Sequence, residues 1–185
     1  MELARLMRER RTVHRFADRP VPHEMIAELL DVAVWAPNHR LTEPWRFVIV
    51  SGDGRRRLAE AARAFREAKD PERGAELGRK TFEKLMGIPM FVAVVMREDE
   101  HPTVRREDYA ATACVIHNFS LLLWERGLGM VWETYPLLNA PAFREALGVG
   151  PGETIVGSLH VGYPANVPPA QPRTPARERM TLIDR

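Results

Sequence analysis

The chain is 185 residues long, which fits one domain, residues 1–185, whose continuous core needs no disulfide or metal to stabilise it. Its 27 Lys and Arg residues nearly balance 25 Asp and Glu residues, so the net charge of +2 gives little support to a nucleic-acid-binding protein. Cys114 is the only cysteine, and neither a signal-peptide pattern nor the ~20 apolar residues of a bilayer span occurs, so we expect a cytoplasmic protein without a membrane segment.

The first half of the chain predicts four helices and two strands. Apolar residues recur at helical spacing, and Pro37 forbids continuation of the second helix. Asp53 stands just before the third predicted helix and is a candidate N-cap. In chain order these elements are a helix over 2–9, a helix between Pro22 and Pro37, a buried strand over 45–51, a helix after the turn 52–54, a helix over 71–86 and a strand over 90–96.

The second half is organised around a long apolar segment, residues 104–126. Its pattern is helical but apolar on nearly every side, which predicts a central helix that a partner subunit helps to bury. Gly127 follows as a helix-terminating residue. The remaining elements are a strand over 128–133, a short helix over 139–147, a strand over 154–161 and a proline-rich extended arm over 163–175.

The common catalytic and metal-binding patterns are missing from this sequence. Gly52 and Gly54 follow a strand, but Arg57 occupies the third glycine position of a dinucleotide fingerprint. The histidine spacings fit no metal site, and an apolar helical position predicts that Cys114 is inert. His117 and His160 lie in apolar runs and are predicted to be hydrogen-bonded core residues. The sequence therefore predicts no catalytic side chain and no metal.

Two short stretches carry the functional information. The stretch 10–16 has arginines and a hydroxyl just after a helix-like segment, a composition suited to holding a phosphate. The stretch 35–45 ends a helix, crosses a polar loop and enters an apolar strand. Together they predict a phosphate-bearing cofactor, which His14 and His39 are placed to contact. The alternative for the basic residues is a solvated or interface surface.

The order of these pieces resembles the FMN-dependent nitroreductase family, in register across nearly the whole chain. It is especially similar to a compact subfamily whose loop reads A-P-[DN]-H. The motifs that carry the resemblance are Arg10-Arg11-Thr12 with Phe16, Ala36-Pro37-Asn38-His39 with Pro44-Trp45, Gly127-Leu128-Gly129 leading to Trp132-Glu133-Thr134, and Gly157 with Gly162 and Pro164.

The resemblance implies an α+β fold with a central, mostly antiparallel sheet flanked by helices. It also implies a homodimer with an extended C-terminal arm and two FMN molecules at the subunit interface. Arg10 and Thr12 would meet the phosphate and ribityl end of FMN. The full set of implied cofactor-binding residues is Arg10, Arg11, Thr12, His14, Trp132, Glu133, Thr134 and Arg173, with Trp35 and His39 supplied by the other chain.

Two departures from the family pattern bear on the chemistry. His14 stands where Arg or Lys is common, which would make the charge near the flavin pyrimidine depend on pH. Glu133 stands where related chains tend to carry Arg. An inward Glu133 side chain would weaken phosphate binding or lower the flavin potential, whereas an outward one would leave only backbone contacts to FMN.

The implied activity is ping-pong hydride transfer from NAD(P)H through FMN to a nitroaromatic, a quinone or a related acceptor. A family member with another task, such as flavin fragmentation, dehalogenation or dehydrogenation, would share every motif. A non-enzymatic basic binding protein is a further alternative, and it would purify without colour.

Overall fold

The computed structural model describes residues 2–184 and has a four-stranded antiparallel sheet at its centre, in the order β1-β2-β4-β3. This confirms the predicted α+β fold with an antiparallel sheet. The strands are β1 (Trp45–Ser51), β2 (Met90–Arg97), β3 (Gly129–Glu133) and β4 (Glu153–Gly162). The α-helices are α1 (Leu3–Glu9), α2 (His23–Ala33), α3 (Arg55–Lys69), α4 (Gly74–Met86), α5 (Pro102–Glu125) and α6 (Pro141–Ala146).

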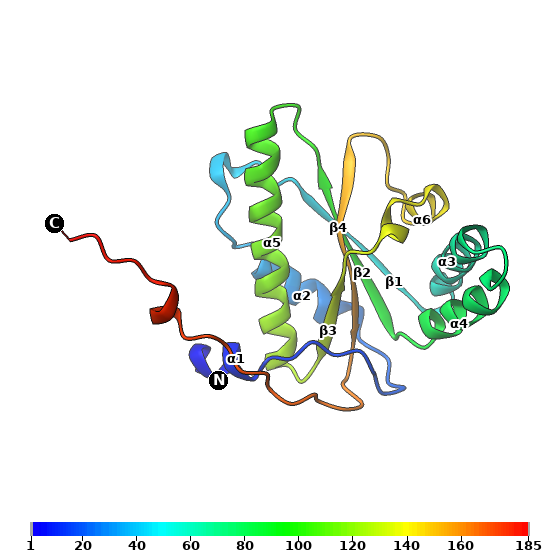
Figure 1. Ribbon diagram of the computed structural model, residues 1–185, viewed down its shortest axis with the longest axis horizontal. Helices are drawn as coiled ribbons and strands as arrows, with labels where there is room; N and C mark the ends of the chain where they lie inside the picture. The colour runs from blue at the N-terminus through cyan, green and yellow to red at the C-terminus, as the bar shows by residue number, and fades with distance from the viewer. Residues whose placement is uncertain (1, 185) are drawn as a thin grey trace.

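Helices cover both faces of the sheet (Figure 1), with α2 and α5 on one face and α3, α4 and α6 on the other. The central strand β2 serves both cores, because successive side chains of a strand point to opposite faces. Val92 and Val94 pack toward α2 and α5, whereas Phe91 and Val95 pack toward α3 and α6. The sheet is therefore a common wall between two apolar clusters.

The extended stretch 10–16 lies against the β3 edge of the sheet. Thr12 forms a parallel bridge with Met130, and the amide of Val13 donates to the Met130 carbonyl at 3.0 Å. Val13 is fully buried over Gly129, where a Cβ atom would lie 2.4 Å from the valine Cγ2. Since Val13 points inward, its neighbours Thr12 and His14 point outward and are exposed.

Three local predictions are corrected by the structure. Asp53 does not cap α3, because Gly54 is the N-cap residue and no side chain bonds there. The helix predicted over 71–86 begins only at Gly74, after a turn in which the Asp70 carboxylate accepts from the amide of Arg73. The helix predicted over 139–147 is a 3₁₀ turn followed by α6, because Pro141 begins a new helix.

The helix α5 is less enclosed than its apolar sequence predicts. Its inner face packs on the sheet and on α2, but Tyr109, Cys114 and His117 are exposed on the single chain. The predicted core position of His117 is therefore wrong for one copy of the chain, and Cys114 lies outside the apolar surroundings from which its inertness was predicted. No helix among residues 2–184 combines the length and hydropathy needed to cross a bilayer.

The segment after β4 leaves the body of the molecule. Residues 165–184 contain one short 3₁₀ turn and otherwise no regular structure, and most of their side chains are exposed. Figure 1 shows this red segment running past α1 and away from the sheet. It carries apolar side chains with little cover, such as Leu182 and Ile183, which are 80% and 87% exposed.

We expect Gly157→Ala to destabilise the fold by about 1–3 kcal/mol, the usual effect of overpacking a core. A Cβ atom at this position would lie 2.1 Å from Nε1 of Trp132, and that nitrogen donates to the Val156 carbonyl at 3.1 Å. Urea unfolding measures the difference. Gly150→Ala is the matched control, because its Cβ would meet only the Glu153 carboxylate at 4.0 Å. Equal stability of the two variants would contradict this packing.

Candidate functional site

Arginines from both ends of the chain meet at one cavity of about 630 Å³. It lies between the start of the stretch 10–16 and the C-terminal segment. Four arginines and no carboxylate line it, so its walls attract anions. The lining residues are Met7, Arg8, Arg10, Arg11, Thr12, Pro168, Pro169, Ala170, Gln171 and Arg173.

The electrostatics of Arg10 mark it as the centre of this cluster. Partial burial lowers the pKa of the Arg10 guanidinium below its ordinary value, and the positive charges of Arg11 and Arg173 lower it further. Arg11 is oriented by hydrogen bonds that its guanidinium donates to the carbonyls of Arg8 and Arg10, at 2.7 and 2.8 Å. A bound anion would relieve this repulsion, because an opposite charge favours the charged form of each arginine.

A second, smaller cavity of about 180 Å³ adjoins the first through shared walls. Arg10 and Thr12 line both cavities. The smaller one adds Trp132 from β3 together with His117 and Ser120 from α5. His117 is a candidate site residue that the sequence did not indicate. The apolar residues around it predict a core position, whereas its side chain is exposed.

The two residues after Trp132 lie apart from both cavities. Glu133 is on the opposite face of β3 from Trp132, because neighbouring residues of a strand alternate. In agreement, its charge acts on Tyr135, whose phenol pKa is raised by burial first and by Glu133 second. Thr134 is exposed beyond the end of the strand.

His160 occupies the α3 and α6 side of β4, where it is 2% exposed with its ring edge-on to Phe91. Its Nε2 has no hydrogen-bond partner among the residues the structure describes, so the prediction of a buried residue is confirmed but not the predicted pairing. Burial lowers the pKa of His160 to about 3, and the charges of Lys84 and His14 contribute. Lys84 and His14 therefore both act on His160, and Lys84 is a residue that no sequence pattern singled out.

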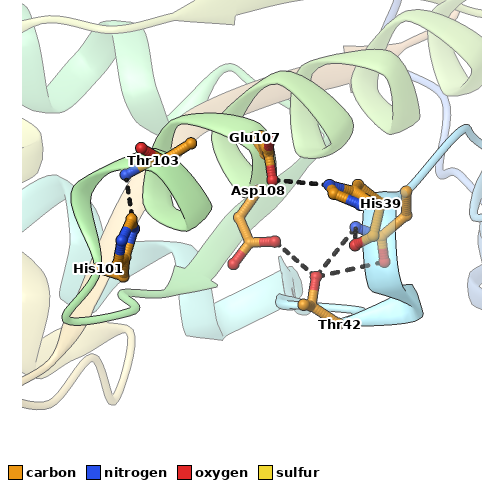
Figure 2. Close-up of polar contacts among 7 residues, drawn as sticks. His39, Thr42, His101, Thr103, Glu107 and Asp108 are labelled. Carbon is orange, nitrogen blue, oxygen red and sulfur yellow. Dashed lines mark hydrogen bonds and ion pairs between the residues drawn. The ribbon is translucent and has the colours of Figure 1, made fainter.

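His39 lies apart from the arginines within one chain. Trp35 follows α2 and is 87% exposed. Figure 2 shows His39 beside the first turns of α5, where its Nδ1 lies 2.9 Å from the Glu107 carboxylate. The arginine side of α5 is marked by His117, ten residues and roughly 15 Å further along the helix. One chain therefore separates the predicted site residues into two groups.

Metal ligands do not gather anywhere in residues 2–184, where no three His, Cys, Asp or Glu side chains are arranged to hold an ion. The exposed side of α5 presents Cys114.

Comparison with known proteins identifies the family. The sequence profile of the nitroreductase family matches residues 7–163, which is most of the chain. The chain belongs to the nitroreductase family. The profile covers the stretch 10–16, the loop after α2 and all four strands, so the resemblance that the motifs carried is confirmed.

Members of the family resemble this chain over its full length. A Bacillus subtilis protein, YfhC, provisionally named an NAD(P)H nitroreductase, is 38% identical over 95% of this chain and 91% of its own. The crystal structure of a nitroreductase-like protein from Bacillus cereus is 40% identical, with a TM-score of 0.91 over 100% and 97% of the two chains. The FMN and NADPH-dependent nitroreductase NfnB from sphigopyxis sp. strain HMH shares the fold at 19% identity, with a TM-score of 0.81 and complete coverage of both chains.

Proposed function

We propose that this nitroreductase-family chain binds FMN and transfers hydride from NAD(P)H to a nitroaromatic, a quinone or a related acceptor in a ping-pong cycle. The observation that carries the proposal is the cavity in which Arg10, Arg11 and Arg173 converge without a carboxylate. The similarity to provisional and characterised NAD(P)H nitroreductases supports the choice of cofactor and donor.

The donor set of the larger cavity fits the phosphate and ribityl end of FMN. Arg10 and Arg173 would hold the phosphate through charge-assisted hydrogen bonds, and the Thr12 hydroxyl would meet the ribityl chain. Arg11, held by backbone carbonyls, would add positive potential. The cavity is large enough for such a group, and a bound phosphate would offset the repulsion among its arginines.

Positive charge beyond the ribityl end would act on the ring of FMN. His14 and Thr12 share one side of the extended stretch, because they are two residues apart. Lys84 and His14 both act on the buried His160, so His14 and Lys84 would stabilise negative charge on the pyrimidine edge. When bound, FMN supplies the ring that accepts and returns the hydride, so the protein needs no side chain that acts as a nucleophile.

The face of β3 would complete the cofactor contacts. Trp132 lines the cavity through its side chain. Glu133 and Thr134 would contribute through their backbone, because the Glu133 side chain faces the other side of the sheet. This orientation keeps the Glu133 carboxylate away from the phosphate. A Glu at a position where related chains tend to carry Arg therefore need not weaken FMN binding.

We infer a homodimer in which Trp35 and His39 of one copy complete the cofactor site of the other. The exposed face of α5 and the uncovered C-terminal segment supply apolar surface for such an interface. The lone cysteine favours a reducing compartment, so we place the protein in the cytoplasm.

The proposal predicts that the purified protein is yellow, or becomes so with added FMN, and that it oxidises NAD(P)H in the presence of a nitroaromatic or a quinone. Absorbance spectroscopy and chromatography of the released cofactor test the first part, and steady-state kinetics tests the second. Parallel lines in a double-reciprocal plot would support the ping-pong order. A flavin-loaded protein without acceptor turnover would favour flavin fragmentation, dehalogenation or dehydrogenation, and a colourless protein without FMN affinity would refute the proposal.

We expect Arg10→Ala to weaken FMN binding by about one to two decades in Kd, equivalent to the 1.5–3 kcal/mol of a charge-assisted hydrogen bond. Fluorescence titration measures this change. Riboflavin is the matched ligand control, because it lacks the phosphate and its affinity should be nearly the same in both proteins. His14→Ala should instead leave FMN affinity nearly intact and alter the rate or potential of flavin reduction. Unchanged FMN affinity in Arg10→Ala would assign the arginine cluster another role.

We expect the FMN-loaded protein to sediment as a dimer at micromolar concentration, with an interface of roughly 2,000 Å² or more. Tyr109→Glu would place a charge on the exposed face of α5 and should shift the equilibrium toward monomer with loss of bound flavin. Glu76→Gln on the distant helix α4 is the control. Sedimentation of a flavin-loaded monomer would contradict the shared site.

A further inference from the structure

The loop after α2 has an unusual backbone. Arg40, Leu41 and Glu43 have φ values of 63°, 50° and 40°, in the left-handed region that L side chains rarely adopt. Such conformations persist only where the surrounding structure holds them, and they concentrate at functional sites. Residues 38–43 therefore need contacts that hold them in this conformation.

Side chains at both ends of the loop hold it together. The Asn38 amide donates to Oγ1 of Thr42 at 3.0 Å, and its Oδ1 accepts from the backbone amide of Glu43 at 2.8 Å. The Arg97 guanidinium donates to the Thr42 carbonyl at 3.3 Å. Thr42 is therefore the residue at which the contacts inside the loop meet those that tie it to the rest of the molecule.

The shortest hydrogen bond between the loop and the rest of the molecule runs to α5. The Thr42 hydroxyl donates to Oδ1 of Asp108 at 2.5 Å, a contact drawn in Figure 2. Asp108 is 3% exposed, and a carboxylate removed from water must be compensated by hydrogen-bond donors. The hydroxyl therefore satisfies a buried acceptor on a rigid helix, and the same bond fixes the loop relative to that helix. The neighbouring contact of His39 with Glu107 is largely solvent-exposed and constrains the loop less.

We propose that Asp108 is a positioning residue that holds the loop 38–43 in its strained conformation through Thr42. The loop presents His39 and the 79% exposed Leu41 at the surface. This inference rests on the proposed function, in which that surface completes the partner's flavin site. Asp108 then sets where the loop meets the acceptor side of the site without touching cofactor or substrate itself.

Limited trypsin digestion of the full-length protein tests the holding role without relying on activity. Cleavage between Arg40 and Leu41 requires the loop to open locally. Thr42→Val removes the hydroxyl and should speed this cleavage about tenfold, as expected for one lost hydrogen bond. Thr42→Ser keeps the donor hydroxyl and Asp108→Asn keeps an acceptor oxygen. The cleavage rates of both variants should therefore stay close to that of the wild type. Mass spectrometry resolves the bond, with Arg177–Glu178 in the exposed C-terminal segment as the internal reference.

Thr112→Val is the matched control. Thr112 is fully buried on α5, and its hydroxyl donates to the backbone carbonyl of Asp108 at 2.8 Å. This substitution removes the same group from the same region without touching the loop, so cleavage after Arg40 should not change. Equal cleavage rates in Thr42→Val and the wild type would overturn the proposal, as would equal acceleration in both valine variants.

Kinetics tests the functional half of the proposal. Thr42→Val should raise KM for the acceptor about tenfold while retaining bound flavin, and Thr42→Ser should restore the wild-type value. Faster loop cleavage with unchanged KM would overturn the link from Asp108 to the site. A wild-type protein that binds no FMN would refute the proposed function instead, and the cleavage comparison would still decide whether Asp108 holds the loop.

Discussion

The packing of the stretch 10–16 against the β3 edge is the constraint on which the rest of the site depends. Val13 fits over Gly129, and Phe16 lies where a Cβ on Gly162 would approach its ring at 2.8 Å. These two glycines let the extended backbone lie close to the sheet. With Val13 held inward, Arg10 reaches the cavities and Thr12 and His14 face outward. A larger residue at either glycine would displace the whole row of polar side chains.

The arginine cluster illustrates how function opposes stability. Arg10 is partly buried beside Arg11 and Arg173, and each neighbour makes its charged form less favourable. A chain selected for stability alone would place a carboxylate here, as the surface pair of Arg46 with Glu153 does elsewhere. Sites that break a local rule in this way are commonly functional. In the proposed function, a phosphate in the cavity would offset this unfavourable charge.

The candidate residues of a single chain fall into two groups. The arginines meet near one end of α5, and His39 meets Glu107 near the other. In the homodimer that we propose, two copies packed along the exposed side of α5 would bring the loop 38–43 of one copy to the cavity of the other.

The local elements of this protein follow from its sequence, because their signals are local. Pro37 prevents α2 from continuing, and apolar residues at alternating or helical spacing indicate the strands and α5. Gly127 adopts φ +75° after α5, as its place after the apolar run predicts. The order of short motifs was also sufficient to identify the family, since each motif keeps its place in the chain.

Only the tertiary structure decided which distant residues meet and which faces remain open. Arg10 and Arg173 line one cavity although most of the chain separates them, and no periodicity encodes that approach. His117 is exposed because packing leaves one side of α5 uncovered, which an apolar sequence cannot reveal. Asp108 is buried because the loop after α2 folds onto it and supplies the Thr42 hydroxyl. Such contacts depend on the path of the chain in space, so the hydrophobic pattern and the local propensities of the sequence do not predict them.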